Sequence, residues 1–176
     1  LGDAVGTNVW DIGLIGAEPQ RAEKIEFTAA YVEIQSTYLV PAGSKLQTIA
    51  DVDKPGVRIV TSARSAYGLW LENNIKNATL IQVSGIDGAF NKFYNEKLEV
   101  LAGLRPGFLK DIEKHPELRI MDGKFTAVQQ AIGCNKSATE GARYIAEFVE
   151  NAKKSGFVAG LIEKHKVKGL SVAPLA

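Results

Sequence analysis

The chain has 176 residues, of which 45% are hydrophobic and 23% are charged, and its formal net charge is +1. This composition is typical of a globular protein of one sizeable domain or two small lobes. The balance of 21 basic against 20 acidic residues gives no electrostatic case for nucleic-acid binding. No apolar stretch approaches the ~18 residues that a membrane helix needs. No signal peptide is visible, so we expect either a cytoplasmic chain or a secreted one that has been processed or truncated.

Strand-like apolar runs alternate with helical patterns along the first half of the chain. Pro19 favours a helix start, because its missing N–H costs nothing at a first helical position. Ser65 is a candidate N-cap. The patterns predict a strand at 11–17, a helix at 19–25, an extended segment at 31–41, a helical turn at 44–52, a strand at 56–62 and a helix at 65–74.

The second half continues the alternation. Ser84 is a candidate N-cap, Pro106 opens a helix, and Ser137 with Glu140 has the spacing of a capping box. The patterns predict strands at 78–83, 98–104 and 118–123, helices starting at 84, 106 and 137, an extended segment at 125–136 and a last helix from 157 to about 169. This order predicts an α/β fold with mainly parallel strands.

The extended segments at 31–41 and 125–136 divide the chain. Between them lies a self-contained βαβαβ set, and the helices after the second segment have no sheet of their own. We therefore predict two lobes, one made of residues 1–41 and 132–176 and the other of residues 42–131. The two extended segments would be paired strands that cross between the lobes and form a hinge.

Three arginines share one kind of position, between the end of a predicted strand and the start of a helix. Arg21 lies in the first turn of its helix, where the positive end of the helix dipole disfavours a cation. Arg64 and Arg105 follow the strands at 56–62 and 98–104. Ligands of open α/β sheets bind outside the carboxyl ends of strands, and guanidinium groups grip carboxylates and phosphates bidentately. The alternative is that each arginine is only an exposed loop residue.

The sequence contains no nucleophile elbow, P-loop, dinucleotide fingerprint or zinc-protease motif. No carboxylates form an obvious acid–base pair, so a binding protein outranks an enzyme. Cys134 is the only cysteine, which excludes an internal disulfide, and we expect it to be a small buried hydrophobe. His115 and His165 lie in polar contexts and are expected at the surface. We expect neither a metal nor a cofactor.

The stretch "DIGLIGAEPQRAEKIEFTAAYV" resembles a motif of bacterial extracellular solute-binding proteins of family 3, the polar amino-acid type that serves ABC importers. The stretches "SKLQTIADVDKPGVRIV" and "QAIGCNKSATEGARYIAEFV" resemble that family's entry into its second lobe and its return strand with the long C-terminal helix. The resemblance covers nearly the whole chain. The residues that match the first motif are Asp11, Arg21, Ile25, Phe27, Thr28 and Tyr31.

The resemblance implies a two-lobe α/β fold of the periplasmic-binding-protein type, with two crossing strands and a ligand trapped by hinge closure. It implies that Arg21 grips the ligand's carboxylate, with backbone contacts near Gly16 and Ala17. The second-lobe loop of glycine followed by serine or threonine corresponds to Arg64-Ser65-Ala66, where Ser65 keeps the hydroxyl and Arg64 replaces the glycine.

Two departures from the family pattern matter. An aspartate that binds the ligand's α-amino group is expected after the strand at 98–104, and this chain has Leu104 and Arg105 there. We therefore expect an anionic ligand, with Arg105 in the site. The family also has roughly 50–60 further residues before the first motif, so the first lobe would be incomplete and its sheet edges exposed unless a further segment or a second chain covers them.

We predict the solute-binding component of an ABC importer for an amino acid or another small organic carboxylate. By resemblance its partners are this ligand and a membrane permease, and its location is periplasmic, or extracellular with a lipid anchor. Two alternatives share the fold: an enzyme similar to cyclohexadienyl dehydratases, and the ligand-sensing domain of a regulator.

Overall fold

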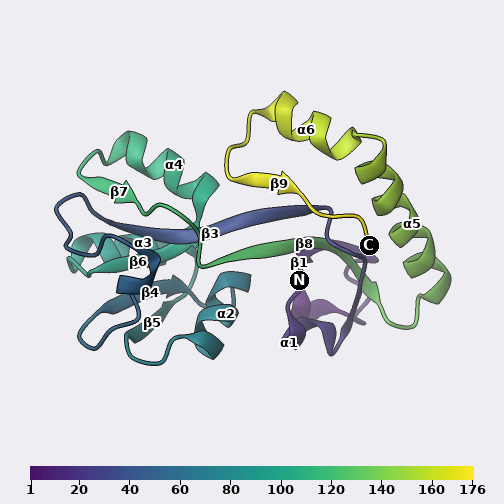
Figure 1. Ribbon diagram of the computed structural model, residues 1–176. Helices are drawn as coiled ribbons and strands as arrows, with labels where there is room; N and C mark the ends of the chain where they lie inside the picture. The colour runs from purple at the N-terminus through teal and green to yellow at the C-terminus, as the bar shows by residue number, and fades with distance from the viewer. The chain divides into compact units, whose positions relative to one another are not determined.

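The computed structural model describes all 176 residues and divides into two compact units (Figure 1). Unit 1 comprises 1–34 and 128–176, and unit 2 comprises 35–127. Two strands connect them, β3 at Val32–Pro41 and β8 at Thr126–Asn135. No helix in the chain combines the length and the apolar character that crossing a bilayer requires.

Unit 1 is built on the strand β8. Strands β1 and β2 both run antiparallel to β8, with Ile12 opposite Cys134 and Phe27 opposite Gly133, while β9 pairs with the first residues of β3. Gly133 is required here, because a Cβ at this position would lie 2.5 Å from Cγ2 of Ile25. The elements are η1 (Gly2–Ala4), β1 (Ile12–Gly16), α1 (Pro19–Ala22), β2 (Ile25–Phe27), α5 (Thr139–Lys154), α6 (Phe157–His165) and β9 (Leu170–Val172).

Unit 2 is a mixed sheet covered by helices. Strand β4 lies between β5 and β6 and is parallel to both, whereas β3 runs antiparallel to β6 and to β7. The elements are η2 (Ile49–Asp51), β4 (Arg58–Ser62), α2 (Ala66–Asn74), β5 (Thr79–Val83), α3 (Ile86–Asn95), β6 (Val100–Leu104), α4 (Arg105–Lys114) and β7 (Leu118–Ile120).

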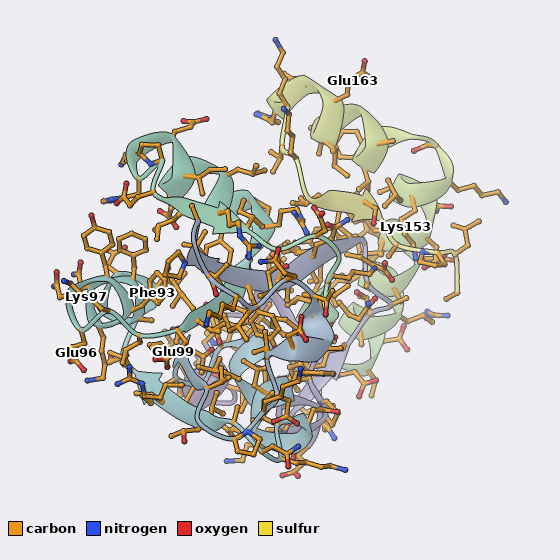
Figure 2. All side chains as sticks on the ribbon, turned by 60° about the vertical axis from the view of Figure 1, so that its left-hand side comes forward. Phe93, Glu96, Lys97, Glu99, Lys153 and Glu163 are labelled. Carbon is orange, nitrogen blue, oxygen red and sulfur yellow. The ribbon has the colours of Figure 1, made fainter.

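The two faces of this sheet carry separate cores, because successive side chains of a strand point to opposite faces. Ile59 of β4 packs in a cluster with Leu71 of α2, and the next residue, Val60, packs in a cluster with Phe93 of α3 and Phe108 of α4. Figure 2 shows Phe93 inside unit 2 and the charged side chains that follow it at the outer margin. Helix α2 therefore covers one face of the sheet, and α3 and α4 cover the other.

The expected α/β class is confirmed, but the expectation of mainly parallel strands is wrong. Among the strand pairs for which the register is defined, β4 is parallel to β5 and β6, and the others are antiparallel. The first helix is also shorter than predicted, because Ile25 pairs with Asn135 as the start of β2.

Two of the predicted helix caps are wrong. Helix α3 begins after Gly85, whose φ of +76° sets the entry, and Ser84 makes no cap. Helix α5 begins after Ala138, because the hydroxyl of Ser137 bonds to Oδ1 of Asn135 instead. Glu140 pairs with Arg143 one turn along the helix. The expected burial of Cys134 is confirmed.

The unit boundaries lie earlier in the chain than the predicted lobe boundaries after residues 41 and 131. Residues 35–41 belong to unit 2, because β3 pairs with β6 from Ser36 and with β7 up to Pro41. Residues 128–131 belong to unit 1, where Ala131 pairs with Ile15 of β1.

Candidate functional site

The turn from β4 to α2 carries three of the predicted site residues, Arg64, Ser65 and Ala66. Ser65 caps the helix, since its Oγ accepts a hydrogen bond from the Gly68 N–H at 3.0 Å and donates one to the Ser62 carbonyl at 2.7 Å. The prediction of an N-cap at Ser65 is confirmed. The only hydroxyl proton of Ser65 is therefore engaged, and an anion at this turn would find the first N–H groups of α2, which have no intrahelical acceptor.

Arg64 has a left-handed backbone with φ of +60°, and it is exposed. A residue with a Cβ pays about 1–2 kcal/mol in this conformation, whereas glycine adopts it readily. This explains why the resembling family has glycine at the position. Asn8, Lys97 and Lys166 also have positive φ, so the backbone conformation alone does not mark Arg64 as a ligand contact.

Buried hydroxyls lie beside this turn. Thr61 of β4 is fully buried and its Oγ1 has no hydrogen-bond partner. Its side chain shares the sheet face of Ile59, two residues earlier, which packs against α2. Ser36 of β3 is also fully buried with an unpartnered Oγ. Leaving a buried hydroxyl unpaired costs about 1–3 kcal/mol, so these groups suit a polar partner at this face.

Arg105 is the first residue of α4 and follows β6 directly. Its Nε donates to Oε1 of Gln35 at 2.8 Å, and its Nη2 donates to the carbonyls of Met121 at 3.2 Å and Gly123 at 2.5 Å. The side chain thus ties the start of α4 to β3 and to the segment that leads into β8. These hydrogen bonds use Nε and Nη2 and do not involve Nη1.

In unit 2 the two arginines follow neighbouring strands of the sheet. Strands β4 and β6 are parallel, with Ile59 opposite Val100 and Val60 opposite Leu101. Their carboxyl ends therefore meet at one edge of the sheet, and Arg64 and Arg105 both begin connections at that edge. The structure thus brings the Arg64-Ser65-Ala66 turn and Arg105 to the same side of unit 2.

Unit 1 holds the other predicted site residues on the β1–α1 connection. Nη1 of Arg21 donates to the Gly16 carbonyl at 2.9 Å, and the Ala17 N–H donates to the Gln129 carbonyl at 2.8 Å. Burial raises the pKa of the Glu18 carboxyl, and the positive charge of Arg21 opposes that rise. Arg21, Gly16 and Ala17 are therefore local neighbours. A common site for Arg21 and the arginines of unit 2 stays a prediction.

Sequence reasoning did not single out the buried hydroxyls of Ser36 and Thr61, or Gln35 as the partner of Arg105. The available signal was a pair of adjacent polar residues inside the strand-like segment at 31–41. The structure shows no group of three or more histidine, cysteine or carboxylate side chains placed to hold a metal ion.

Solved structures supply the comparison. The chain superimposes on a putative binding component of an ABC transporter from Wolinella succinogenes, complexed with lysine, with a TM-score of 0.80 and 19% identity over 93% of this chain and 73% of that one. The solute receptor for L-cysteine of Neisseria gonorrhoeae gives a TM-score of 0.80 and 16% identity over 98% and 74% of the two chains. The chain has the fold of these ABC-transporter solute-binding proteins.

One protein with the same fold is the ancestral precursor of an enzyme. The ancestral amino-acid-binding protein AncCDT-1, a precursor of cyclohexadienyl dehydratase, matches with a TM-score of 0.75 and 20% identity over 93% of this chain and 72% of that one. No protein-family model matches the chain. No curated protein matches its sequence. The likeness therefore establishes the two-lobe fold that the sequence motifs predicted.

Proposed function

We propose that this protein is a solute-binding component of an ABC importer and that it binds a small organic anion, an acidic amino acid or another carboxylate. The observation that carries the proposal is the shared strand edge of unit 2. There the exposed Arg64, on a left-handed backbone, and the unpaired hydroxyl of Thr61 lie at the turn from β4 to α2, and Arg105 begins α4 at the end of the neighbouring strand β6. The fold supports the transport role, because the matched proteins named above bind amino acids for ABC transporters or are described as receptors for them.

The proposed mechanism uses one contact set from each unit. Arg21 grips a carboxylate of the ligand, and the Arg64-Ser65-Ala66 turn with Arg105 holds its second acidic group. Closure about the two connecting strands, β3 and β8, traps the ligand, and a membrane permease receives it. A periplasmic or lipid-anchored extracellular location follows from this role.

Calorimetry tests the proposal with L-glutamate, succinate, L-lysine and L-cysteine. We expect L-glutamate and succinate, the two ligands with two carboxylates, to bind best. We expect Arg21→Gln and Arg64→Gln to weaken their binding by tenfold or more, since charge-assisted hydrogen bonds are worth about 1.5–3 kcal/mol each. Arg58→Gln is the matched control, because Arg58 is an exposed arginine of unit 2 that pairs with Glu99. Stronger binding of lysine than of glutamate would refute the anionic ligand, and no binding of any of the four would refute the solute-binding role.

A second function, a dehydratase-type lyase, is favoured by one observation. Glu18 neighbours Arg21, and burial raises the pKa of its carboxyl, which suits a general acid. An assay for elimination from a cyclohexadienyl substrate, with Glu18→Gln as the comparison, separates the two functions. Turnover that is lost in the variant would establish the enzyme, whereas binding without turnover would leave the transport role. A sensing domain of a regulator would also bind the ligand without turnover.

A further inference from the structure

Unit 2 contains a small cavity between its sheet and its helices. The cavity has a volume of about 130 Å³, close to the ~150 Å³ of an engineered apolar cavity that stays dry and binds benzene. Its wall is formed by the end of β6 together with α2, α3 and α4. The wall residues used below are Tyr67, Ile86, Ala89, Gly107, Phe108 and Asp111.

The cavity lies at the starts of three helices. Tyr67 is the second residue of α2, Ile86 the first of α3 and Gly107 the third of α4. These helices follow β4, β5 and β6 (Figure 1), and β4 is parallel to both of the other strands. Their starts therefore lie at the carboxyl edge of the parallel strands, which is where ligands of open α/β sheets bind. Arg64 and Arg105 belong to the same edge.

The wall of the cavity continues from both arginine positions. Tyr67, which is only 5% exposed, directly follows the Arg64-Ser65-Ala66 turn. Burial raises the pKa of the Tyr67 hydroxyl, and hydrogen bonding to the neighbouring serine side chains opposes this rise. On α4, Gly107 lies two residues after Arg105 in the first turn of the helix. The cavity is therefore bordered by residues that are close in sequence to both arginines.

The side chains of the wall are apolar except for those of Tyr67 and Asp111. Ala89 and Phe108 belong to the buried core between the sheet and the helices α3 and α4. Burial raises the pKa of the Asp111 carboxyl. A second carboxylate in the cavity would be repelled by Asp111, and the wall has no lysine or arginine to compensate its desolvation. The cavity therefore suits an uncharged, apolar group.

We propose that this cavity is the subsite for an uncharged apolar substituent of the ligand, a branched alkyl group or a phenyl ring. The inference rests on the proposed function and narrows it, because the ligand is then an organic anion with an apolar side chain. Its acidic groups stay at the arginines, and the substituent lies against Ala89 and Phe108. Each buried CH₂ group of the substituent raises the affinity about fourfold.

Calorimetry compares succinate with 2-isobutylsuccinate and 2-benzylsuccinate, each enantiomer separately. The wild-type chain should bind at least one substituted acid about tenfold or more tightly than succinate. Gly107→Leu adds a side chain at the cavity, and it should fold because a Cβ at Gly107 meets no atom within 4 Å. In this variant the preference over succinate should fall below about twofold. Gly160→Leu is the matched control, because Gly160 of α6 in unit 1 has the same free space, and this variant should keep the preference.

Toluene tests the cavity without any acidic group. In a chain with labelled alanine methyl groups, the NMR signal of Ala89 should shift when toluene is added to the wild type, and it should shift less than half as far in Gly107→Leu. Circular dichroism checks that each variant folds. If Gly107→Leu melts early, Ala89→Leu repeats the calorimetry by filling the cavity from its buried wall.

The outcomes separate this inference from the function on which it rests. Succinate binding with no gain from either substituent, or an equal gain in Gly107→Leu, would overturn the subsite and leave the anion-binding role intact. Toluene that leaves the Ala89 signal in place would also overturn the subsite. Toluene binding without binding of any of the three acids would refute the anion-binding role, and with it the assignment of the cavity to that ligand.

Discussion

Replacing Arg64 by glycine should raise the stability of unit 2 while it weakens ligand binding. Arg64 has φ of +60°, a conformation that costs a residue with a Cβ about 1–2 kcal/mol. Glycine removes that cost, but its greater freedom in the unfolded chain takes back about 0.4–1 kcal/mol. The expected net gain is about 0.5–1 kcal/mol in the free energy of unfolding, or roughly 1–4 °C in the melting temperature of a chain of this size.

Urea denaturation measures the stability, and calorimetry with L-glutamate measures the affinity. Two comparison variants separate the causes. Lys97→Gly relieves a similar conformation, with φ of +51° at the end of α3, and should raise stability without changing affinity. Arg64→Ala keeps the strained backbone and removes the charge, so it should lower affinity with no gain in stability. The reasoning fails if Arg64→Gly lowers stability, or if it leaves the affinity for glutamate unchanged.

Three further predictions concern the close packing at Gly133, the hydrogen bonds of Arg105 and the pH dependence of stability. Gly133→Ala should destabilise the chain by about 1–3 kcal/mol in urea, because its Cβ would lie 2.5 Å from Ile25; wild-type stability would refute the close packing. Arg105→Ala should lower the free energy of unfolding by about 2 kcal/mol, because two carbonyls and a side-chain oxygen lose their hydrogen-bond donor. A loss below about 0.5 kcal/mol in the same urea assay would show that these hydrogen bonds do not stabilise the fold. The ion pair with Lys153 lowers the pKa of Glu150 in the folded state, so its stabilisation is present above pH 4.5 and lost as pH falls below that value. In urea denaturation at a series of pH values, Glu150→Gln should reduce the loss of unfolding free energy below pH 4.5. An equal loss in the variant and the wild type would contradict a stabilising Glu150–Lys153 pair.

Several helix starts could be predicted from the residues alone. The cap at Ser65 and the proline-led starts of α1 and α4 follow from backbone preferences that act within one turn, and the structure has them where the sequence places them. Ser84 and Ser137 had similar signals and cap nothing. A glycine in a positive-φ conformation and a neighbouring asparagine changed those helix entries, and single-residue propensities do not describe such competition.

By itself the sequence determined the alternation of strands and helices and the two long connecting segments. It also contained the motifs whose resemblance to solute-binding proteins predicted the two-lobe fold. Only the tertiary structure decided the direction of β3 against β6, the left-handed backbone at Arg64 and the hydrogen bonds that occupy Arg105. The physical reason is range. Helix starts and apolar periodicity depend on neighbours a few residues away. Strand partners can be 140 residues apart, as Val32 and Val172 are, and the Gln35 acceptor of the Arg105 guanidinium is 70 residues away.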